Sequence, residues 1–186
     1  SGLHRFGLQA LLHVFRKWDQ AASTRPERVL AISAWVARLL WRAYRRPAQV
    51  IYPPVEIERF HPAPTRQDYF ICVSRMEPHK KLAVVVEAFN RLGLPLLLVG
   101  EGRQKARLQK MARSNIRFLH HQTDGEVADL MSRARAFVHA GAEDFGIALV
   151  EAQAAGCPVI AYQRGGASET VIHGRTGILF PKQTPE

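Results

Sequence analysis

Short apolar runs alternate with amphipathic segments along the last two thirds of the chain. The amphipathic segments repeat their apolar positions with the 3.6-residue period of helices. Strands that alternate with helices of 10–12 residues indicate βαβ units and a parallel sheet, so the predicted fold class is α/β. The predicted strands lie at residues 69–74, 95–100, 116–119, 136–140, 158–161 and 177–180, and the predicted helices at 81–92, 103–113, 124–134 and 146–155.

The amino-terminal part of the chain follows a different pattern. A helical stretch at residues 3–18 precedes a short apolar run at 29–32, and a second helical stretch covers 34–45. Ser33, directly before the second stretch, has the side chain of a helix N-cap. Residues 50–52 predict a strand that two prolines stop. These few elements make a poor independent core.

We therefore expect two parts in the chain. Residues 1–60 are interpreted as the remnant of a preceding α/β domain with its linker, and residues 61–186 as a second domain. Thr184-Pro185-Glu186 has the pattern of a helix start, which predicts that the second domain is truncated at its carboxyl end.

The composition is that of a folded protein, with 47% hydrophobic and 23% charged residues. No run of about 18 apolar residues is present, and the first residues lack the apolar centre of a signal peptide. We therefore expect a cytosolic protein. Cys72 and Cys157 lie among apolar residues and are too few for a disulfide framework, so we expect reduced, buried thiols.

The formal net charge of +10 is concentrated at the amino-terminal end, where residues 1–46 carry nine Arg or Lys against two acidic residues. Arg38, Arg42 and Arg45 fall at i, i+4 and i+7 and form a basic stripe on the second predicted helix. Such a segment suggests phosphates, nucleic acid or peripheral contact with an anionic membrane. A solvated helix face is the simpler alternative, and composition alone does not choose among them.

The densest cluster of reactive side chains follows the predicted strand at 136–140. Glu143 lies in that loop, Gly146 opens the next helix, and Glu151 lies five residues further on. A helix start offers free N–H groups and the positive end of a dipole, which suits a phosphate. At 1.5 Å per residue, Glu151 lies roughly 7.5 Å along the helix from Gly146. One carboxylate near the phosphates and another about a sugar's length away can contact the two ends of a nucleoside diphosphate. Alternatively, Glu143 only complements the helix dipole and Glu151 is solvated.

Two cations follow the first strand of the second domain. Arg75 leaves from the end of that strand, and Lys80 lies at the start of the helix after it. Loops at the carboxyl ends of parallel strands gather at one edge of the sheet, so both cations can meet one diphosphate. The alternative is a solvated basic loop.

Glycines mark the loops after two further strands: Gly100 and Gly102, and Gly165 and Gly166. They permit a ligand to approach the backbone closely, but they are equally compatible with plain turns. A dinucleotide fingerprint and a P-loop are both absent. The eight histidines have no zinc spacing, and no G-x-S-x-G motif occurs. We therefore expect neither a metal nor a cofactor.

These features occur together and in order in one family. The chain resembles the family-4 retaining glycosyltransferases of GT-B fold, especially the bacterial mannosyltransferases that build O-antigen and related polysaccharides. The resemblance covers nearly the whole chain and includes Glu143 and Glu151 in the E-x7-E spacing. The other matching segments are Trp18-Asp19-Gln20-Ala21-Ala22, Ala31-Ile32-Ser33, Val50-Ile51-Tyr52-Pro53-Pro54-Val55, Arg59-Phe60-His61-Pro62, Ser74 to Lys80, Val99-Gly100-Glu101-Gly102 and Gly165 to Glu169.

The resemblance implies roles for single residues. Arg75 and Lys80 match positions that contact the donor diphosphate. Glu143 matches a residue near the donor sugar, and Glu151 matches one that binds the ribose hydroxyls.

Further positions follow from the same resemblance. The backbone at Phe145-Gly146-Ile147 is expected to face the sugar and the phosphates, and the loop after Phe118-Leu119 to lie near the base. Asp144 and Lys81 replace glycines that are common in the family. A stiffer loop is therefore expected at Asp144.

As a whole, the resemblance implies a Rossmann-like parallel-sheet domain, the donor-binding half of a GT-B fold. It is expected to bind a nucleoside diphosphate sugar, with GDP-mannose favoured, for retaining hexosyl transfer to a glycan or lipid-linked acceptor. Most of the catalysis would come from positive charge that stabilises the leaving diphosphate and from orientation of the reactants. The acceptor site would lie in the amino-terminal domain, so this chain alone is expected to hold a donor and transfer nothing.

Two other classes of protein remain open. Sugar-nucleotide epimerases of the same fold use two similar halves, but they match the motifs at residues 52–55 and 143–147 less well. A nucleic-acid-binding module would explain the sequence pI of about 10.3. Against it, the basic excess lies in one terminal segment that carries no known nucleic-acid-binding motif, so we expect no nucleic acid partner.

Overall fold

The structure is a computed structural model that describes residues 2–120 and 122–185, and for residues 2–6 and 10 the backbone alone. The chain divides into two compact units, Ser1–Tyr52 and Pro53–Glu186. The helix start predicted at residues 184–186 includes residue 186, which lies outside the described residues.

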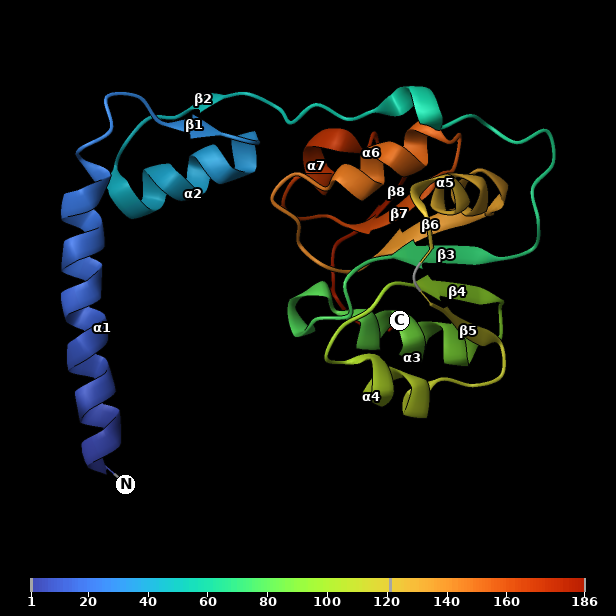
Figure 1. The fold of residues 1–186 in the computed structure, drawn as a ribbon, viewed down its shortest axis with the longest axis horizontal. Helices are drawn as coiled ribbons and strands as arrows, with labels where there is room; N and C mark the ends of the chain where they lie inside the picture. Colours follow the sequence, from blue (N-terminus) through green and yellow to red (C-terminus); the bar gives the residue numbers. More distant parts are fainter. Residues whose placement is uncertain (1, 121, 186) are drawn as a thin grey trace. The chain divides into compact units, whose positions relative to one another are not determined.

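The second unit is built on a six-stranded parallel sheet with the strand order β5-β4-β3-β6-β7-β8 (Figure 1). Each predicted strand is found within about one residue of its expected bounds. The order reverses between β3 and β6, and ligands of open α/β sheets bind at such a switch point, outside the carboxyl ends of the strands. The strands are β3 (Phe70–Val73), β4 (Leu96–Val99), β5 (Ile116–Leu119), β6 (Ala136–His139), β7 (Val159–Tyr162) and β8 (Gly177–Phe180).

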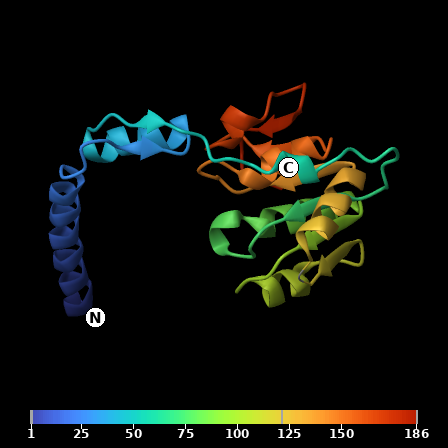
Figure 2. The same cartoon turned by 45° about the horizontal axis from the view of Figure 1, so that its top comes forward.

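Helices cover both faces of this sheet. Two helices lie together on one side and two on the other, as Figures 1 and 2 show. All four were predicted from the apolar period, whereas α7 (Ala167–Thr170) was not, because four residues are too few to show a period. The two pairs are α3 (Leu82–Leu92) with α4 (Lys105–Met111), and α5 (Asp124–Arg133) with α6 (Ile147–Ala154).

The core is split by the sheet into two apolar clusters. Successive side chains of β3 point to opposite faces: Ile71 packs with Met131 and Leu149 from the α5–α6 side, and Cys72 packs with Val86 from the α3–α4 side. All five are almost fully buried. Burial on both faces explains why these strands are continuous apolar runs rather than alternating patterns.

The division between the units lies eight residues before the predicted end of the linker at residue 60. Phe60 is buried in the α5–α6 cluster, which anchors its segment to the second unit. Arg66, further along, donates hydrogen bonds to the carbonyl oxygens of Arg135 and Gly156. The segment that starts at Pro53, with its 3-10 helix Ile57–Arg59, is therefore part of the second unit rather than a free linker.

The first unit contains two helices and a two-stranded parallel pair: α1 (Gly2–Ser23), β1 (Leu30–Ala31), α2 (Ala34–Tyr44) and β2 (Gln49–Val50). The Oγ atom of Ser33 accepts a hydrogen bond of 3.0 Å from the N–H of Val36, which confirms the predicted cap. No residue of α2 is buried. None of the described helices is long and apolar enough to cross a membrane.

Candidate functional site

The loops at the carboxyl edge of the sheet are joined in pairs. The N–H of Met76, after β3, donates to the carbonyl of Glu101, after β4, over 2.7 Å. The N–H of Gln104 donates back to the carbonyl of Met76 over 2.9 Å. The Glu77 carboxylate also pairs with Arg103 at 2.8 Å, which holds the pKa of Glu77 below its usual range although burial works the other way. The loops after β3 and β4 are therefore fixed to each other by hydrogen bonds and an ion pair.

A second pair of loops joins across β6 and β7. The N–H of Gly166 donates to the carbonyl of Glu143 over 2.7 Å, and Glu143 and Gly165 form an isolated parallel bridge. The backbone of Glu143 is thus fixed by the neighbouring loop, independently of its side chain.

The four loop glycines are needed for this joining. A Cβ at Gly100 or Gly102 would collide with the backbone of Ser74 or Met76. A Cβ at Gly165 or Gly166 would collide with the backbone of Glu143 or Phe145. These glycines were predicted to let a ligand approach the backbone closely. In the structure, the backbone of a neighbouring loop makes this close approach. The donor-binding role of these glycines stays a prediction.

Lys80, Glu143 and His139 lie together at the switch between β3 and β6. The Lys80 Nζ atom lies 2.6 Å and 2.8 Å from the two carboxylate oxygens of Glu143. The Nε2 atom of His139, the last residue of β6, lies 2.9 Å from Glu143 Oε1. Lys80 and Glu143, a cation and a carboxylate both predicted for the site, are thus in direct contact.

The charge of Glu143 is strongly stabilised in this cluster. Burial favours the neutral carboxyl, but the contacts with His139 and Lys80 outweigh it and lower the pKa of Glu143 to about 2. Glu143 is therefore a carboxylate across the physiological range. It is suited to accept hydrogen bonds and unsuited to act as a general acid near neutral pH.

Arg75 lies in a neighbouring depression of about 440 Å³. Its side chain is exposed, and the depression opens where β3, β4 and β5 end. Gly100 and Gly102 line it with Arg75, whereas Lys80 and Glu143 are not among its described lining residues. The remaining lining residues are Val73, Glu77, Val99, Glu101, Gln122 and Val127.

The start of α6 has the geometry that its sequence predicts. Gly146 has φ +88°, a left-handed conformation that favours glycine, and a Cβ there would lie 2.8 Å from Leu149 Cδ1. Ile147 is the first helical residue and is 46% exposed, so the helix terminus is open to solvent. Phe145, in contrast, is buried and packs into the protein.

Glu151 pairs with a different cation, Arg59. Its Oε1 atom lies 3.3 Å from Arg59 Nη2, while Arg59 Nη1 lies 2.9 Å from Asp124 Oδ2. Arg59 therefore links the 3-10 helix before Phe60 to the start of α5 and to the middle of α6. The second Glu151 oxygen has no described partner in this arrangement.

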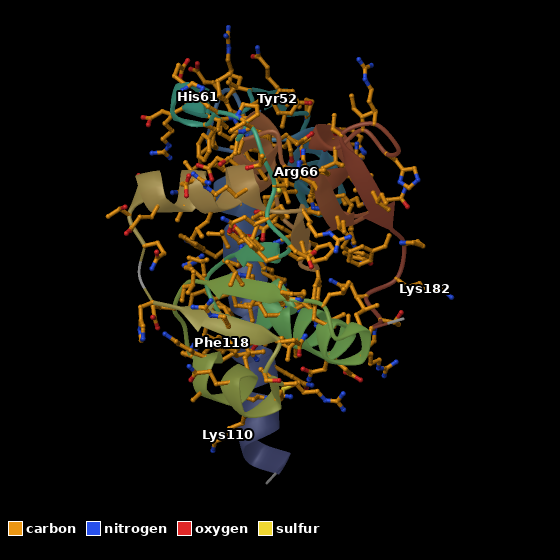
Figure 3. All side chains as sticks on the ribbon, turned by 90° about the vertical axis from the view of Figure 1, so that its right-hand side faces the viewer. Tyr52, His61, Arg66, Lys110, Phe118 and Lys182 are labelled. Carbon is orange, nitrogen blue, oxygen red and sulfur yellow. The ribbon has the colours of Figure 1, made fainter. Side chains whose placement is uncertain are left out.

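Phe118 and Leu119 contribute packing more than open surface. Phe118, labelled in Figure 3, packs against the α3–α4 cluster, and Leu119 packs against the α5–α6 cluster. Both are partly buried. Any role near a base therefore falls to the loop that follows them.

Two residues of the site were not predicted as such. His139 stands out in hindsight as a polar residue that ends the apolar run Ala136-Phe137-Val138. Arg59 was assigned to the linker, and only its place in a family motif distinguished it. Arg59 lies far from Asp124 and Glu151 in sequence, whereas His139 is only four residues from Glu143.

The remaining predictions concern metals, thiols and the basic stripe. No group of three or more His, Cys, Asp or Glu residues that could hold a metal ion is found among the described residues. Cys72 and Cys157 are free and buried, as predicted, and burial raises the pKa of their thiols to about 12 and about 11. The three arginines of the stripe, on α2 and its C-cap, are all exposed, and Arg38 lies over the Trp35 ring at 6.0 Å.

The chain shares its fold with glycosyltransferases of known structure. The Anabaena protein HepE in complex with UDP-glucose superimposes with a TM-score of 0.81 over 91% of this chain and 54% of that chain, at 24% sequence identity. This agreement, together with the parallel sheet, shows a Rossmann-like α/β domain.

Sequence comparisons point to the same group of proteins. The chain is 28% identical to an uncharacterized glycosyltransferase of Methanocaldococcus jannaschii over 91% of this chain and 50% of that protein. It is 30% identical to the GDP-mannose-dependent alpha-(1-6)-phosphatidylinositol monomannoside mannosyltransferase of Mycobacterium tuberculosis over 81% of this chain and 48% of that protein. The chain thus spans about half the length of these relatives. Residues 55–186 match the family described as glycosyl transferases group 1, and the chain belongs to that family.

Proposed function

We propose that this chain is the donor-binding part of a retaining glycosyltransferase that uses a nucleoside diphosphate sugar. The observation that carries the proposal is the meeting of Lys80, Glu143 and the open start of α6 at the switch between β3 and β6. A cation and a helix N-terminus favour a phosphate at this edge of the sheet. The carboxylate of Glu143 favours hydroxyl groups beside it.

In the proposed mechanism, Arg75 and Lys80 bind the diphosphate and stabilise the charge that develops as it leaves the anomeric carbon. Backbone N–H groups at Gly146 and Ile147 add to this stabilisation. Glu143, ionised at all relevant pH values, accepts hydrogen bonds from the donor sugar. The acceptor hydroxyl enters from the face that the diphosphate leaves, so the anomeric configuration is retained.

Glu151 is proposed to accept hydrogen bonds from the ribose hydroxyls. Its contact with Arg59 uses Oε1, which leaves Oε2 for a ligand. The β3–β4 depression, which contains Arg75 and Gly100, lies next to this part of the edge and is proposed to take the rest of the nucleoside with the loop after Leu119. Gly102, Gly165 and Gly166 then shape the site through the loops that they join.

GDP-mannose is the favoured donor. The mycobacterial relative is GDP-mannose-dependent, and it aligns over most of this chain. The Anabaena neighbour binds UDP-glucose, but at 24% identity it supports the fold alone. The acceptor is proposed to be a glycan or lipid-linked sugar bound by an amino-terminal domain, of which residues 1–52 are a part. The exposed arginines of α2 support peripheral contact with an anionic membrane at its cytoplasmic side.

A ligand series tests the proposal. Thermal unfolding of the chain is measured with millimolar GDP, GDP-mannose, UDP and UDP-glucose, and with a short DNA duplex at two salt concentrations. We expect both guanine nucleotides to raise the Tm by mass action and the duplex to have no effect at the higher salt. A stronger effect of the uracil nucleotides would overturn the mannosyl assignment. Stabilisation by the duplex alone would support the nucleic-acid alternative instead.

A further inference from the structure

The guanidinium group of Arg59 bridges two helices of the second unit. Its Nη1 atom donates to Asp124 Oδ2, on the first residue of α5, over 2.9 Å, and its Nη2 atom donates to Glu151 Oε1, on α6, over 3.3 Å. The 3-10 helix Ile57–Arg59, which carries this side chain, lies beside α5 and α6 (Figure 1). Because a guanidinium is planar and rigid, its contact with Asp124 also fixes the direction of the N–H groups that face Glu151.

The base of the Arg59 side chain is anchored as well. Phe60, the next residue, is 4% exposed, and its N–H donates to the carbonyl of Ile57 over 3.0 Å. The guanidinium carbon of Arg59 lies 5.2 Å from the centre of the Phe60 ring, within the range of a cation–π contact. Arg59 is therefore held at both ends, by a buried ring next to its backbone and by a carboxylate on α5.

The two main ion pairs of Arg59 differ in exposure. The side chain of Asp124 is 79% exposed, whereas that of Glu151 is 17% exposed. An exposed ion pair contributes little to stability, because water solvates both charges. The carboxylate of Glu151 is largely enclosed, so its orientation depends on its partners within the protein. Among the described residues, Arg59 is the cation that pairs with it.

We propose that Arg59 is a positioning residue for the ribose of the nucleotide: by binding Oε1 of Glu151, it fixes the carboxylate so that Oε2 accepts hydrogen bonds from the ribose hydroxyls. This inference rests on the proposed function, in which Glu151 binds those hydroxyls. A glutamate side chain that is free to rotate samples several rotamers, and a ligand that binds it must order it. Arg59 orders the side chain before the ligand arrives, which raises the affinity for a ligand that carries the hydroxyls.

The alternative role of Arg59 is a general attraction between its charge and the diphosphate. Such an attraction raises the affinity for any nucleotide, whatever its sugar. Three carboxylates surround the single guanidinium, because Glu56 Oε2 also lies 3.6 Å from Nη1, and their charges oppose this attraction. Positioning, in contrast, affects only ligands that carry ribose hydroxyls. The two roles therefore differ in the ratio of two affinities.

Binding of GDP and of 2′,3′-dideoxy-GDP tests the proposal, since the two ligands differ only in the ribose hydroxyls. Calorimetry gives the ratio of their dissociation constants, and UDP with 2′,3′-dideoxy-UDP gives the same ratio for a uracil base. For the unaltered chain we expect the dideoxy ligand to bind about 10- to 100-fold more weakly, as for the loss of hydrogen bonds to a carboxylate. Arg59→Gln should lower this ratio by about two- to tenfold and leave the affinity for the dideoxy ligand unchanged.

Arg135→Gln is the matched control. Arg135 pairs with Asp68 at 2.8 Å, and its guanidinium carbon lies 5.2 Å from the centre of the Phe70 ring. Its contacts are thus of the same kind as those of Arg59, but Arg135 precedes β6 and lies at the amino edge of the sheet, away from the site. The control should keep the full ratio. Glu151→Ala, which removes the carboxylate itself, should bring the ratio close to one.

The outcomes separate the inference from the proposed function. A full ratio in Arg59→Gln, or equal weakening of both ligands, would overturn the inference alone when Glu151→Ala still loses the ratio. A ratio close to one in the unaltered chain, or a full ratio in Glu151→Ala, would overturn the ribose-binding role of Glu151 and the inference with it. No binding of any of the four nucleotides by the folded chain would overturn the donor site as well. If Arg59→Gln binds none of them, Arg59→Lys, which keeps the charge but has one nitrogen to share between the carboxylates, is judged by the same ratio.

Discussion

Lys81 has a backbone conformation that favours glycine. Its φ is +56°, in the left-handed region, where it ends the 3-10 helix Pro78–Lys80 and precedes α3. The family resemblance already indicated that a glycine is common at this position. A side chain there costs energy because its Cβ approaches the following carbonyl oxygen.

We predict that Lys81→Gly stabilises the protein by up to about 1 kcal/mol, since relief of this strain exceeds the added freedom of the unfolded chain. Urea unfolding measures the change. Lys110→Gly is the matched control: Lys110, labelled in Figure 3, is exposed within α4, and its loss should destabilise by about 0.5–1 kcal/mol. Equal destabilisation by both variants would show that the backbone at Lys81 is not strained.

Glu143 predicts a specific pH dependence of stability. Its pKa is lowered from 4.5 to about 2 in the folded protein, so its ionisation stabilises the fold above pH 4.5, and this contribution disappears as the pH falls through 2. We expect the free energy of unfolding of the unaltered chain to exceed that of Glu143→Gln by an amount on the order of 3 kcal/mol at pH 7, shrinking between pH 5 and pH 2. Denaturant titrations of both proteins at several pH values measure it. A difference that does not change with pH would contradict the pairing of Glu143 with Lys80 and His139.

At the residue scale, the sequence identified the right types of side chain but not their partners. Lys80 and Glu143 were both predicted from strand-end positions, yet 63 residues separate them, and their direct contact depends on the order of the strands. Arg59 was missed as a site residue for the same reason, since 92 residues separate it from Glu151. A partner brought close by the fold leaves no local signal in the sequence.

At the element scale, the loop glycines join neighbouring elements. Gly166 has an ordinary φ of −62°, so its replacement by alanine adds no backbone strain and tests packing alone. Gly174 has φ +76° with open space around it, so its replacement tests strain alone. Comparing the two replacements distinguishes a glycine required by close packing from one required by a positive φ, which the sequence alone does not distinguish.

We predict that Gly166→Ala destabilises the protein by about 3 kcal/mol, because the new Cβ collides with the backbone of Phe145 and forces the β6 and β7 loops apart. Gly174→Ala should cost about 1 kcal/mol and leave the loops in place. Guanidinium unfolding compares them. A Gly166→Ala protein as stable as the unaltered chain would mean that the two loops are free to separate.

The elements themselves were largely predictable. All six strands of the second unit and its four longer helices follow from the alternation of apolar runs and amphipathic stretches, because a parallel sheet buried on both faces imposes that pattern. The boundary at residue 52 and the helix α7 were not predictable. The first depends on one buried aromatic side chain, Phe60, and the second is too short to show a period.

At the scale of the whole molecule, the position of the site follows from topology. The strand order turns back between β3 and β6, and Arg75 and Lys80 follow β3 while Glu143 follows β6. The parallel direction of the strands then brings their loops to one edge. Because the chain spans about half the length of its relatives, donor binding is the part of the proposed activity that this chain can be tested for directly.

The most direct test is the affinity of the chain for GDP with and without Arg75. Arg75 and Arg107 are both exposed, but Arg75 lines the depression at the edge of the sheet and Arg107 lies on α4. Calorimetry should show that the unaltered chain and Arg107→Ala bind GDP alike. Arg75→Ala should bind about 10- to 100-fold more weakly, as expected for the loss of a charge-assisted hydrogen bond worth about 1.5–3 kcal/mol. Equal affinities of the three proteins, or no heat with millimolar GDP from a folded chain, would contradict the proposed donor site.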